Sequence, residues 1–470
     1  MTTLAERIRG VKIDVPSETA AISEKKNIRE VKIDVPSETA AISEKKNIRE
    51  VKIDVPSETA AASERIGEVK IDAPSEAAAI SETNTKPSAS FEDYGLSPQL
   101  LRGIYGTGFE KPSEIQRKAI VPIKEAKDTI VQAQSGMGKT GAFSIGLLAR
   151  MDFRQKRIQA VVLCHTHELA SQTNRVISKF GEHCMEDGSV FCQTFIGGTQ
   201  VKEDIDRIKE GMIVAVCTPG RLLDLTQKGH IEPSQIKIIV IDEADEMLSK
   251  GFWEQIKKFL GYVPRDVQIV LVSATMPEEV LKLTEGFMRD PIKILMKPTQ
   301  LVLDGLKQYY IDTDEMSDNG KKLEVLIDLL YPIPSQTVVV FVNTKRSADL
   351  LTRQLSGAGY NPEAIHSDMS GEDRKRIMER FINEKFKVLI STDLMARGID
   401  IPKVSIVINY EMTKDWHIYL HRIGRAGRFG KKGIAINFIS DEDKEIITKF
   451  ENHYEKKIDV MPQNFMEALL

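Results

Sequence analysis

Residues 129–140 read TIVQAQSGMGKT, a short apolar run that leads directly into a glycine-bearing loop, after which we expect a helix to open at Gly141, Ala142 and Phe143. This order is typical of a phosphate-binding loop, in which backbone N–H groups point at phosphate oxygens and the helix dipole adds to the attraction. In the pattern GxxxxGK[ST], Lys139 reaches the β- and γ-phosphates and the hydroxyl of Thr140 holds Mg²⁺. The first glycine of the pattern is Ala133 here, so a chance match is the alternative for the loop taken alone.

An acidic element follows about a hundred residues later, where the apolar run 238–241 ends in Asp242 and Glu243. A buried strand that ends in two acids can supply one carboxylate for Mg²⁺ and a second one to orient or deprotonate a water. Solvated acids at a strand end are the alternative. The presence of the phosphate loop in the same chain favours the metal-binding interpretation.

The composition sets limits on the class of protein. A length of 470 residues favours two or three domains, and an apolar content of 41% supports globular folding. No signal peptide and no run of eighteen apolar residues is present, so we expect an intracellular protein without membrane contact. The net charge of −4 confines any nucleic-acid contact to a local strip. A zinc site or a disulfide framework is not expected, because no CxxC pair occurs among Cys164, Cys184, Cys192 and Cys217.

The first ninety residues contain an internal repeat. VKIDVPSETAAISEKKNIRE occupies residues 11–30 and recurs unchanged at 31–50, and altered copies begin at Val51 and Val69. The unit has no aromatic residue and no leucine, so it offers little apolar surface to offset the entropy lost on ordering. We therefore predict that residues 1–87 form a repetitive, disordered or transiently helical tail. A packed array of repeats is the alternative.

From Phe91 onward, apolar runs alternate with amphipathic stretches, which predicts α/β domains with parallel sheets. We place a first domain at 88–297, a polar linker at 298–305 and a second domain at 306–470. The strands expected in the first domain are 129–132, 160–164, 213–217, 238–241 and 269–272. Those expected in the second are 308–311, 338–342, 387–390, 404–408 and 433–438. Two such domains create a cleft in which ligands can bind at strand ends.

An aromatic residue and an amide precede the phosphate loop. Phe109 offers a flat apolar face, and the amide of Gln116 offers both a donor and an acceptor, which suits the Hoogsteen edge of adenine. A helix start capped by Ser113 is the alternative. Ser273 and Thr275 follow a predicted strand, and their hydroxyls are candidates to link the acidic pair to the surface between the domains.

The run HRIGRAGR at 421–428 places three arginines among two glycines. Glycines let the backbone approach a ligand, and arginine forks stabilise charge on a phosphoryl group during transfer. Such arginines in the second domain would reach a nucleotide held by the first domain only when the cleft closes. A basic surface patch is the alternative.

The chain also contains shorter motifs in a fixed order. The full series is GFEKPSEIQ (108–116), AQSGMGKT (133–140), HTHELA (165–170), GG (197–198), TPGR (218–221), DEAD (242–245), SAT (273–275), STDLMARGID (391–400) and HRIGRAGR (421–428). This series resembles the motifs of the DEAD-box RNA helicases, and the resemblance covers nearly everything from Phe91 onward. It implies two tandem RecA-like domains around a cleft and an RNA-dependent ATPase that uses ATP and Mg²⁺. It also implies sequence-independent contact with RNA, a protein regulator, and a monomer in the cytoplasm or nucleus.

The same resemblance assigns roles to individual residues. ATP binding falls to Phe109, Gln116, Ala133, Gln134, Ser135, Gly136, Met137, Gly138, Lys139, Thr140 and Asp400. Catalysis falls to Lys139, Asp242, Glu243 as the base, and Arg425 and Arg428 as arginine fingers. The Mg²⁺ ligands are Thr140 and Asp242, and interdomain coupling falls to Ser273 and Thr275. The RNA strip comprises His167, Gly197, Gly198, Thr218, Gly220, Arg221, Arg374 and Thr392.

Two motifs depart from the family pattern. The family motif PTRELA appears as HTHELA, so His167 stands in place of an arginine that contacts phosphate. The family motif HGDM with a following QxxR appears as HSDM at 366–369, with Gly371 in place of the glutamine, three residues before Arg374. Histidine carries a weaker, pH-dependent charge than arginine. Neither departure touches ATP chemistry, and the strength of RNA contact is the property that both call into question.

The subgroup and the exact activity have more than one interpretation. LLRGIYGTGFEKPS and the ending VMPQNFMEALL resemble the group of translation initiation factor 4A and its nuclear paralogue of exon-junction and ribosomal-RNA-processing complexes. SGMGKT and LCHT resemble the splicing and mRNA-export helicases instead. For the activity, an ATP-gated RNA clamp with little unwinding and a DNA translocase are the alternatives to a helicase.

Overall fold

The computed structural model describes residues 90–248, 250–296, 305–314, 319–393, 404–426 and 433–462. The predicted tail at 1–87, nearly all of the predicted linker, Asp400 and Arg428 lie outside the described residues. Within the described ranges, no helix has the length and apolar character needed to cross a membrane.

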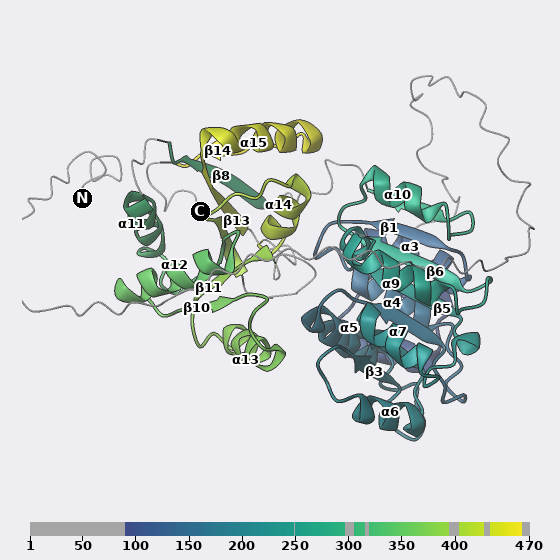
Figure 1. Cartoon of the computed structure of the whole chain (residues 1–470). Coiled ribbons are helices and arrows are strands. Elements are labelled where there is room, and N and C mark those ends of the chain that lie inside the picture. The colour runs from purple at the N-terminus through teal and green to yellow at the C-terminus, as the bar shows by residue number, and fades with distance from the viewer. Residues whose placement is uncertain are drawn as a thin grey trace, which may run out of the picture. The chain divides into compact units, whose positions relative to one another are not determined.

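The first sheet has seven parallel strands in the order β3-β4-β2-β5-β6-β1-β7. Figure 1 labels β1, β5 and β6 of this sheet together with helices of the same domain. Its strands are β1 (Thr129–Gln132), β2 (Ala160–Leu163), β3 (Cys192–Phe195), β4 (Val214–Cys217), β5 (Ile238–Asp242), β6 (Gln268–Ser273) and β7 (Ile292–Leu295). Alternate residues of each buried strand enter different core clusters: Val131 and Val240 belong to one cluster, Ile130 and Ile239 to the other. This alternation buries both faces of the sheet and explains the continuous apolar runs in its strands.

Helices cover both faces of this sheet. One face packs against α2 (Pro98–Gly106), α3 (Glu114–Lys124), α4 (Lys139–Leu148) and α5 (His167–Phe180). The other face packs against α6 (Val201–Glu210), α7 (Pro219–Gln227), α8 (Ala244–Met247), α9 (Lys250–Leu260) and α10 (Glu278–Thr284). Two short 3₁₀ helices, η1 (Glu92–Tyr94) and η2 (Pro233–Gln235), complete the elements of this part.

The second sheet repeats the arrangement of the first, with seven parallel strands in the order β10-β11-β9-β12-β13-β8-β14. Its strands are β8 (Leu306–Asp312), β9 (Thr337–Phe341), β10 (Pro362–Ile365), β11 (Val388–Ser391), β12 (Val404–Asn409), β13 (Gly433–Ile439) and β14 (Asp459–Val460). One face packs against α11 (Asn319–Leu330) and α12 (Lys345–Gly357). The other packs against α13 (Gly371–Ile382), α14 (Trp416–Ile423) and α15 (Asp441–Tyr454).

The predicted fold class, two tandem α/β domains with parallel sheets, is confirmed. All ten expected strands are present, and the bounds of each agree with the structure to within two residues. Sequence analysis missed β3, β7, β10 and β14. These four strands occupy the outer edges of the two sheets, where one side lacks a neighbour and the apolar run is correspondingly weak.

Candidate functional site

The predicted phosphate loop connects β1 to α4, as the sequence pattern requires. Gly136 and Gly138 have φ angles of +85° and +91°, a left-handed conformation that other residues rarely adopt. The buried side chain of Lys139 donates a hydrogen bond of 2.6 Å from Nζ to the backbone oxygen of Ala133. The φ of Ala133 is not positive, so the family glycine is not needed there for backbone freedom.

Gln116 contacts the phosphate loop while it also starts α3. Its Oε1 accepts a hydrogen bond of 2.8 Å from the N–H of Ser113, which forms a capping box with it. Its Nε2 donates to the backbone oxygen of Gly138 at 3.3 Å. A methyl group added at Gly138 would lie only 2.7 Å from that Nε2, so the glycine is needed for the amide to reach the loop. The alternative interpretation, a helix start capped by Ser113, is confirmed.

Phe109 lies at the same loop. A methyl group added at Gly141 would lie 3.3 Å from Cε1 of Phe109, and the ring also packs edge-on against Phe180 at 5.3 Å between centroids. The structure therefore brings the aromatic ring and the amide to one side of the phosphate loop. Adenine recognition by these two residues stays a prediction.

The acidic pair lies at the end of β5, and both of its side chains are buried. Glu243 has a φ of +50°, a conformation that costs a non-glycine residue roughly 1–3 kcal/mol and is found mostly at functional sites. Burial and the adjacent carboxylate of Glu243 raise the pKa of Asp242. Burial also opposes ionisation of Glu243, but the positive charges of His421 and Lys139 outweigh this opposition and lower its pKa.

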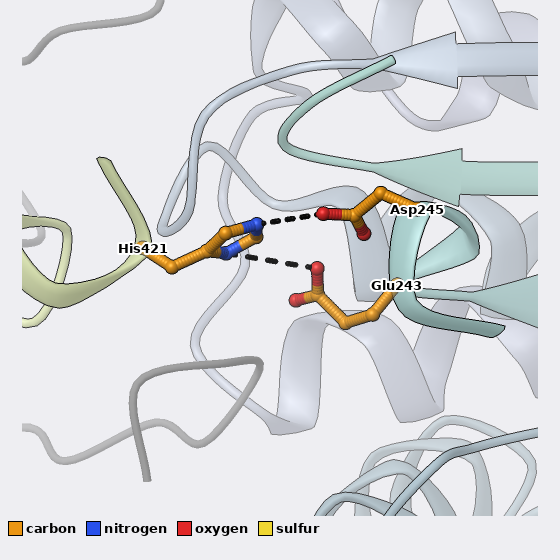
Figure 2. Close-up of side chains that lie close together, drawn as sticks. All are labelled: Glu243, Asp245 and His421. Atoms are coloured by element: carbon orange, nitrogen blue, oxygen red, sulfur yellow. Dashed lines mark hydrogen bonds and ion pairs between the residues drawn. The ribbon is translucent and has the colours of Figure 1, made fainter. Parts of the chain in front are cut away.

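A hydrogen-bond network joins the acidic element to α14 of the second sheet domain (Figure 2). Ser273 Oγ donates to Asp245 Oδ1 at 2.7 Å, and Thr275 Oγ1 donates to Asp245 Oδ2 at 2.6 Å. His421 Nε2 lies 3.0 Å from the same Oδ2, and its Nδ1 lies 3.9 Å from Glu243 Oε2. Because Asp245 can only accept when ionised, Nε2 of His421 carries a proton and donates it to this oxygen.

This network revises one expectation from the sequence. Ser273 and Thr275 were expected to link the pair of Asp242 and Glu243 to the other domain, but the carboxylate they hold is that of Asp245. Asp245 and His421 were quoted within motifs and given no role. The only signal in the sequence was their place in DEAD and HRIGRAGR.

The arginines of the HRIGRAGR run separate into different environments. Arg425 is 1% exposed, and its Nη2 donates to Ser135 Oγ of the phosphate loop at 3.0 Å. Arg422 is also buried, but it donates to Asp393 Oδ1 at 2.6 Å, to the Glu411 backbone oxygen at 2.7 Å and to Asn343 Oδ1 at 2.8 Å. Neither described arginine forms a surface patch, and only Arg425 lies at the phosphate loop.

Most of the predicted first-domain RNA strip surrounds one cavity of about 440 Å³. The strip residues that line it are His167, Gly197, Thr218, Gly220 and Arg221. The remaining member, Gly198, directly follows Gly197 and has a φ of +80°. The N–H of Gly197 donates to Thr218 Oγ1 at 3.3 Å, which ties the glycine loop to the start of α7.

Arg221 is held by its own domain. Its guanidinium pairs with the carboxylate of Asp204 from α6, and its Nη2 donates to the backbone oxygen of Thr199 at 2.7 Å. The side chain of Asp204 is only 1% exposed, and burial, which outweighs the attraction of Arg221, raises its pKa. Sequence analysis missed Asp204, although an acid on the inner face of α6 was a usable signal.

The two second-domain members of the strip occupy different settings. Arg374 Nε lies 3.2 Å from Glu168 Oε1, and the two side chains are 11% and 10% exposed. This ion pair joins α13 to α5. Thr392 directly follows β11, and its backbone oxygen accepts a hydrogen bond of 2.8 Å from Ser391 Oγ. RNA contact by either residue stays a prediction.

Comparison with known proteins places this arrangement in a family. Residues 113–283 match the family model described as DEAD/DEAH box helicase, and residues 321–430 match the helicase conserved C-terminal domain. The chain is 49% identical over 384 residues to a probable eukaryotic initiation factor 4A of Trypanosoma cruzi, covering 82% of this chain and 94% of that protein. It is 45% identical over 380 residues to eukaryotic initiation factor 4A of Drosophila melanogaster, covering 81% and 93%.

A solved structure supports the same assignment. S. cerevisiae Dbp5 bound to RNA and ADP BeF3 aligns with a TM-score of 0.73 and 33% identity, over 81% of this chain and 98% of that chain. Both family models, the relatives and the fold agree with the motifs and with the geometry around the phosphate loop. The chain therefore belongs to the DEAD-box family of ATP-dependent RNA helicases.

Proposed function

We propose that this chain closes on ATP and single-stranded RNA, strains or separates a short duplex or an RNA–protein complex, and reopens after hydrolysis. The observation that carries the proposal is the contact of Arg425 with Ser135, because it places a second-domain arginine on the first-domain phosphate loop. A nucleotide site completed by both domains couples the bound nucleotide to domain closure.

Mg²⁺ fits the residues at the predicted metal site. Thr140 is the second residue of α4 and Asp242 ends β5, and hydroxyl and carboxylate oxygens are ligands that Mg²⁺ prefers. The raised pKa of Asp242 reflects a buried carboxylate that a divalent cation would stabilise in its charged form. When bound with ATP, the metal would neutralise charge that develops on the phosphates.

Glu243 is the residue that we propose to orient and deprotonate the attacking water. Within the described residues, its buried Oε2 accepts no hydrogen bond, so this oxygen can accept one from a water. The neighbouring His421 keeps the carboxylate ionised, and His421 is itself fixed by Asp245. Arg425 and the predicted second finger, Arg428, would stabilise charge on the phosphoryl group.

For RNA, we propose that the cavity beside the glycine loop grips the sugar-phosphate backbone without reading sequence. The lining mixes small residues and backbone turns with few charges, which suits backbone contact. The names of the relatives support a role in translation initiation, with mRNA or rRNA processing or export as the alternative pathway. A similar structure, of S. cerevisiae Dbp5 with Gle1 and IP6, supports a protein regulator for this chain as well.

One experiment separates the proposal from its rivals. Steady-state ATP hydrolysis is measured without nucleic acid, with single-stranded RNA and with single-stranded DNA, and strand release is followed on a short RNA duplex. We expect RNA, but not DNA, to stimulate ATP hydrolysis. We also expect strand release from the RNA duplex. Stimulation by RNA without strand release would identify an ATP-gated clamp, and equal stimulation by DNA would identify a DNA translocase.

A further inference from the structure

Two of the positions that depart from the family pattern, one in each altered motif, lie against each other in space. His167 is the first residue of α5 and Gly371 is the first residue of α13. A methyl group added at Gly371 would lie 3.5 Å from Nδ1 of His167, and one added at Gly197 would lie 3.9 Å from its Nε2. The imidazole ring therefore lies between a glycine of its own domain and a glycine of the other domain.

The backbone does not require a glycine at position 371. Its φ is not in the positive range, and glycine in a helix is less favourable than most other residues. A methyl group would make only an ordinary contact with the ring, but a longer side chain leaving the backbone in that direction would meet the imidazole. The absence of a side chain at 371 thus leaves room for the ring at 167.

An ion pair lies directly beside this contact. Glu168 follows His167, and Arg374 lies one helical turn after Gly371, so the ring–glycine contact and the Glu168–Arg374 pair at 3.2 Å join the same two helices. The spacing between α5 and α13 therefore determines both contacts. A change of one contact must alter the geometry of the other.

The surroundings favour an uncharged ring. Burial lowers the pKa of His167, and the charges of Arg374 and Arg221 lower it further, against the opposing effect of Glu168. The N-termini of α5 and α13 both carry partial positive charge near the ring. In this arrangement the side chain packs as a neutral ring, whereas an arginine would bring a permanent charge to the same place.

We propose that His167 and Gly371 are a matched positioning pair that sets how closely α5 and α13 approach when the two domains bind RNA. The ring takes the room that a side chain at 371 would need, and the pair acts through the Glu168–Arg374 ion pair. The proposal deepens the RNA-stimulated ATPase function proposed above and rests on it.

A double-mutant cycle tests the pair. The variants are Gly371→Gln, Gly371→Ala, His167→Ala and the double variant His167→Ala with Gly371→Gln. Each is assayed for kcat at saturating RNA and for the RNA concentration that gives half-maximal ATPase, the KM for RNA.

We expect Gly371→Ala to resemble the parent. We expect Gly371→Gln to raise the KM for RNA about tenfold with little change in kcat, because the effects of substitutions at contacting residues depend on each other. In the His167→Ala background, Gly371→Gln should change the KM for RNA less than about twofold, because the ring is gone.

The control is Gly357→Gln at the last residue of α12, where an added methyl group meets no described atom within 4 Å. It should leave the KM for RNA unchanged. An equal effect of Gly371→Gln with and without the ring would overturn the proposal. A parent ATPase that RNA does not stimulate would overturn the proposed function instead. Thermal unfolding checks every variant, and Gly371→Ser replaces Gly371→Gln in the cycle if the glutamine variant does not fold.

Discussion

The two sheet domains share one strand order but differ in the segments that connect to the ends of their strands. In the first domain β1 leads into the phosphate loop, whereas β8, at the equivalent place in the second sheet, leads into Thr313 and Asp314. β5 ends in the acids Asp242 and Glu243, whereas its counterpart β12 leads to Glu411, whose carboxylate accepts a hydrogen bond of 2.6 Å from the N–H of Asn343. The scaffold is common to both domains, and the loops give each domain its chemistry.

The charges of the two domains are complementary. The first domain contributes the phosphate loop and buried carboxylates, and α14 of the second contributes His421, with Arg425 just after it. In the proposed function, the site is complete only when both domains contribute to it. Substitutions on the two sides should therefore have different effects on ATP binding and on turnover.

The largest effect is expected for Arg425→Ala on the second-domain side. Turnover should fall roughly a thousandfold or more, the range for loss of an arginine finger, while ATP affinity changes far less because the first domain holds the phosphates. Single-turnover hydrolysis and nucleotide titration measure the two quantities. Arg425→Lys, which keeps the charge and loses the fork, should recover part of the rate. A parent-like rate in Arg425→Ala would show that Arg425 is not an arginine finger.

On the first-domain side, Glu243→Gln should leave ATP binding nearly intact and nearly abolish turnover. The amide keeps the size of the side chain but cannot accept a proton, and loss of a general base costs about 10²- to 10⁴-fold. Steady-state ATPase with saturating RNA is the measurement, with Glu210→Gln on the exposed end of α6 as the control. Near-normal ATP hydrolysis in Glu243→Gln would show that Glu243 is not the general base.

A smaller effect is expected for Asp204→Asn, which tests whether Arg221 positions the glycine loop. The amide cannot balance the buried guanidinium, so the loop around Gly197 should loosen and the KM for RNA should rise about tenfold, with ATP binding unchanged. Asp206→Asn, two residues away on the same helix and more exposed, is the matched control. Equal KM values for the two variants would indicate that Arg221 has no part in ordering the loop.

The smallest effect is expected for removal of residues 1–87. Their repeats contain no aromatic residue and no leucine, so the sequence predicts little contribution to a packed core. The melting temperature and the RNA-stimulated ATPase of residues 88–470 should match those of the full chain within error. A loss of several kcal/mol of unfolding free energy would contradict the prediction, since surface changes usually cost less than about 0.5 kcal/mol.

The sequence by itself determined the features that depend on neighbouring residues. Apolar runs specified the ten inner strands, and the local spacing of TIVQAQSGMGKT specified a strand, a glycine-bearing loop and a helix after it, which the structure begins at Lys139, two residues before the expected start at Gly141. These features follow from backbone geometry and side-chain periodicity, which act over a few residues.

Only the tertiary structure decided which distant side chains meet. It separated Arg422, which binds within its own domain, from Arg425, which lies at the phosphate loop. It showed that Ser273 forms a hydrogen bond with Asp245, and that His167 lies against Gly371. A sequence motif does not specify how far apart two chain segments lie in space. Contacts that depend on the packing of two sheets and their helices could therefore not be derived from the spacing of residues along the chain.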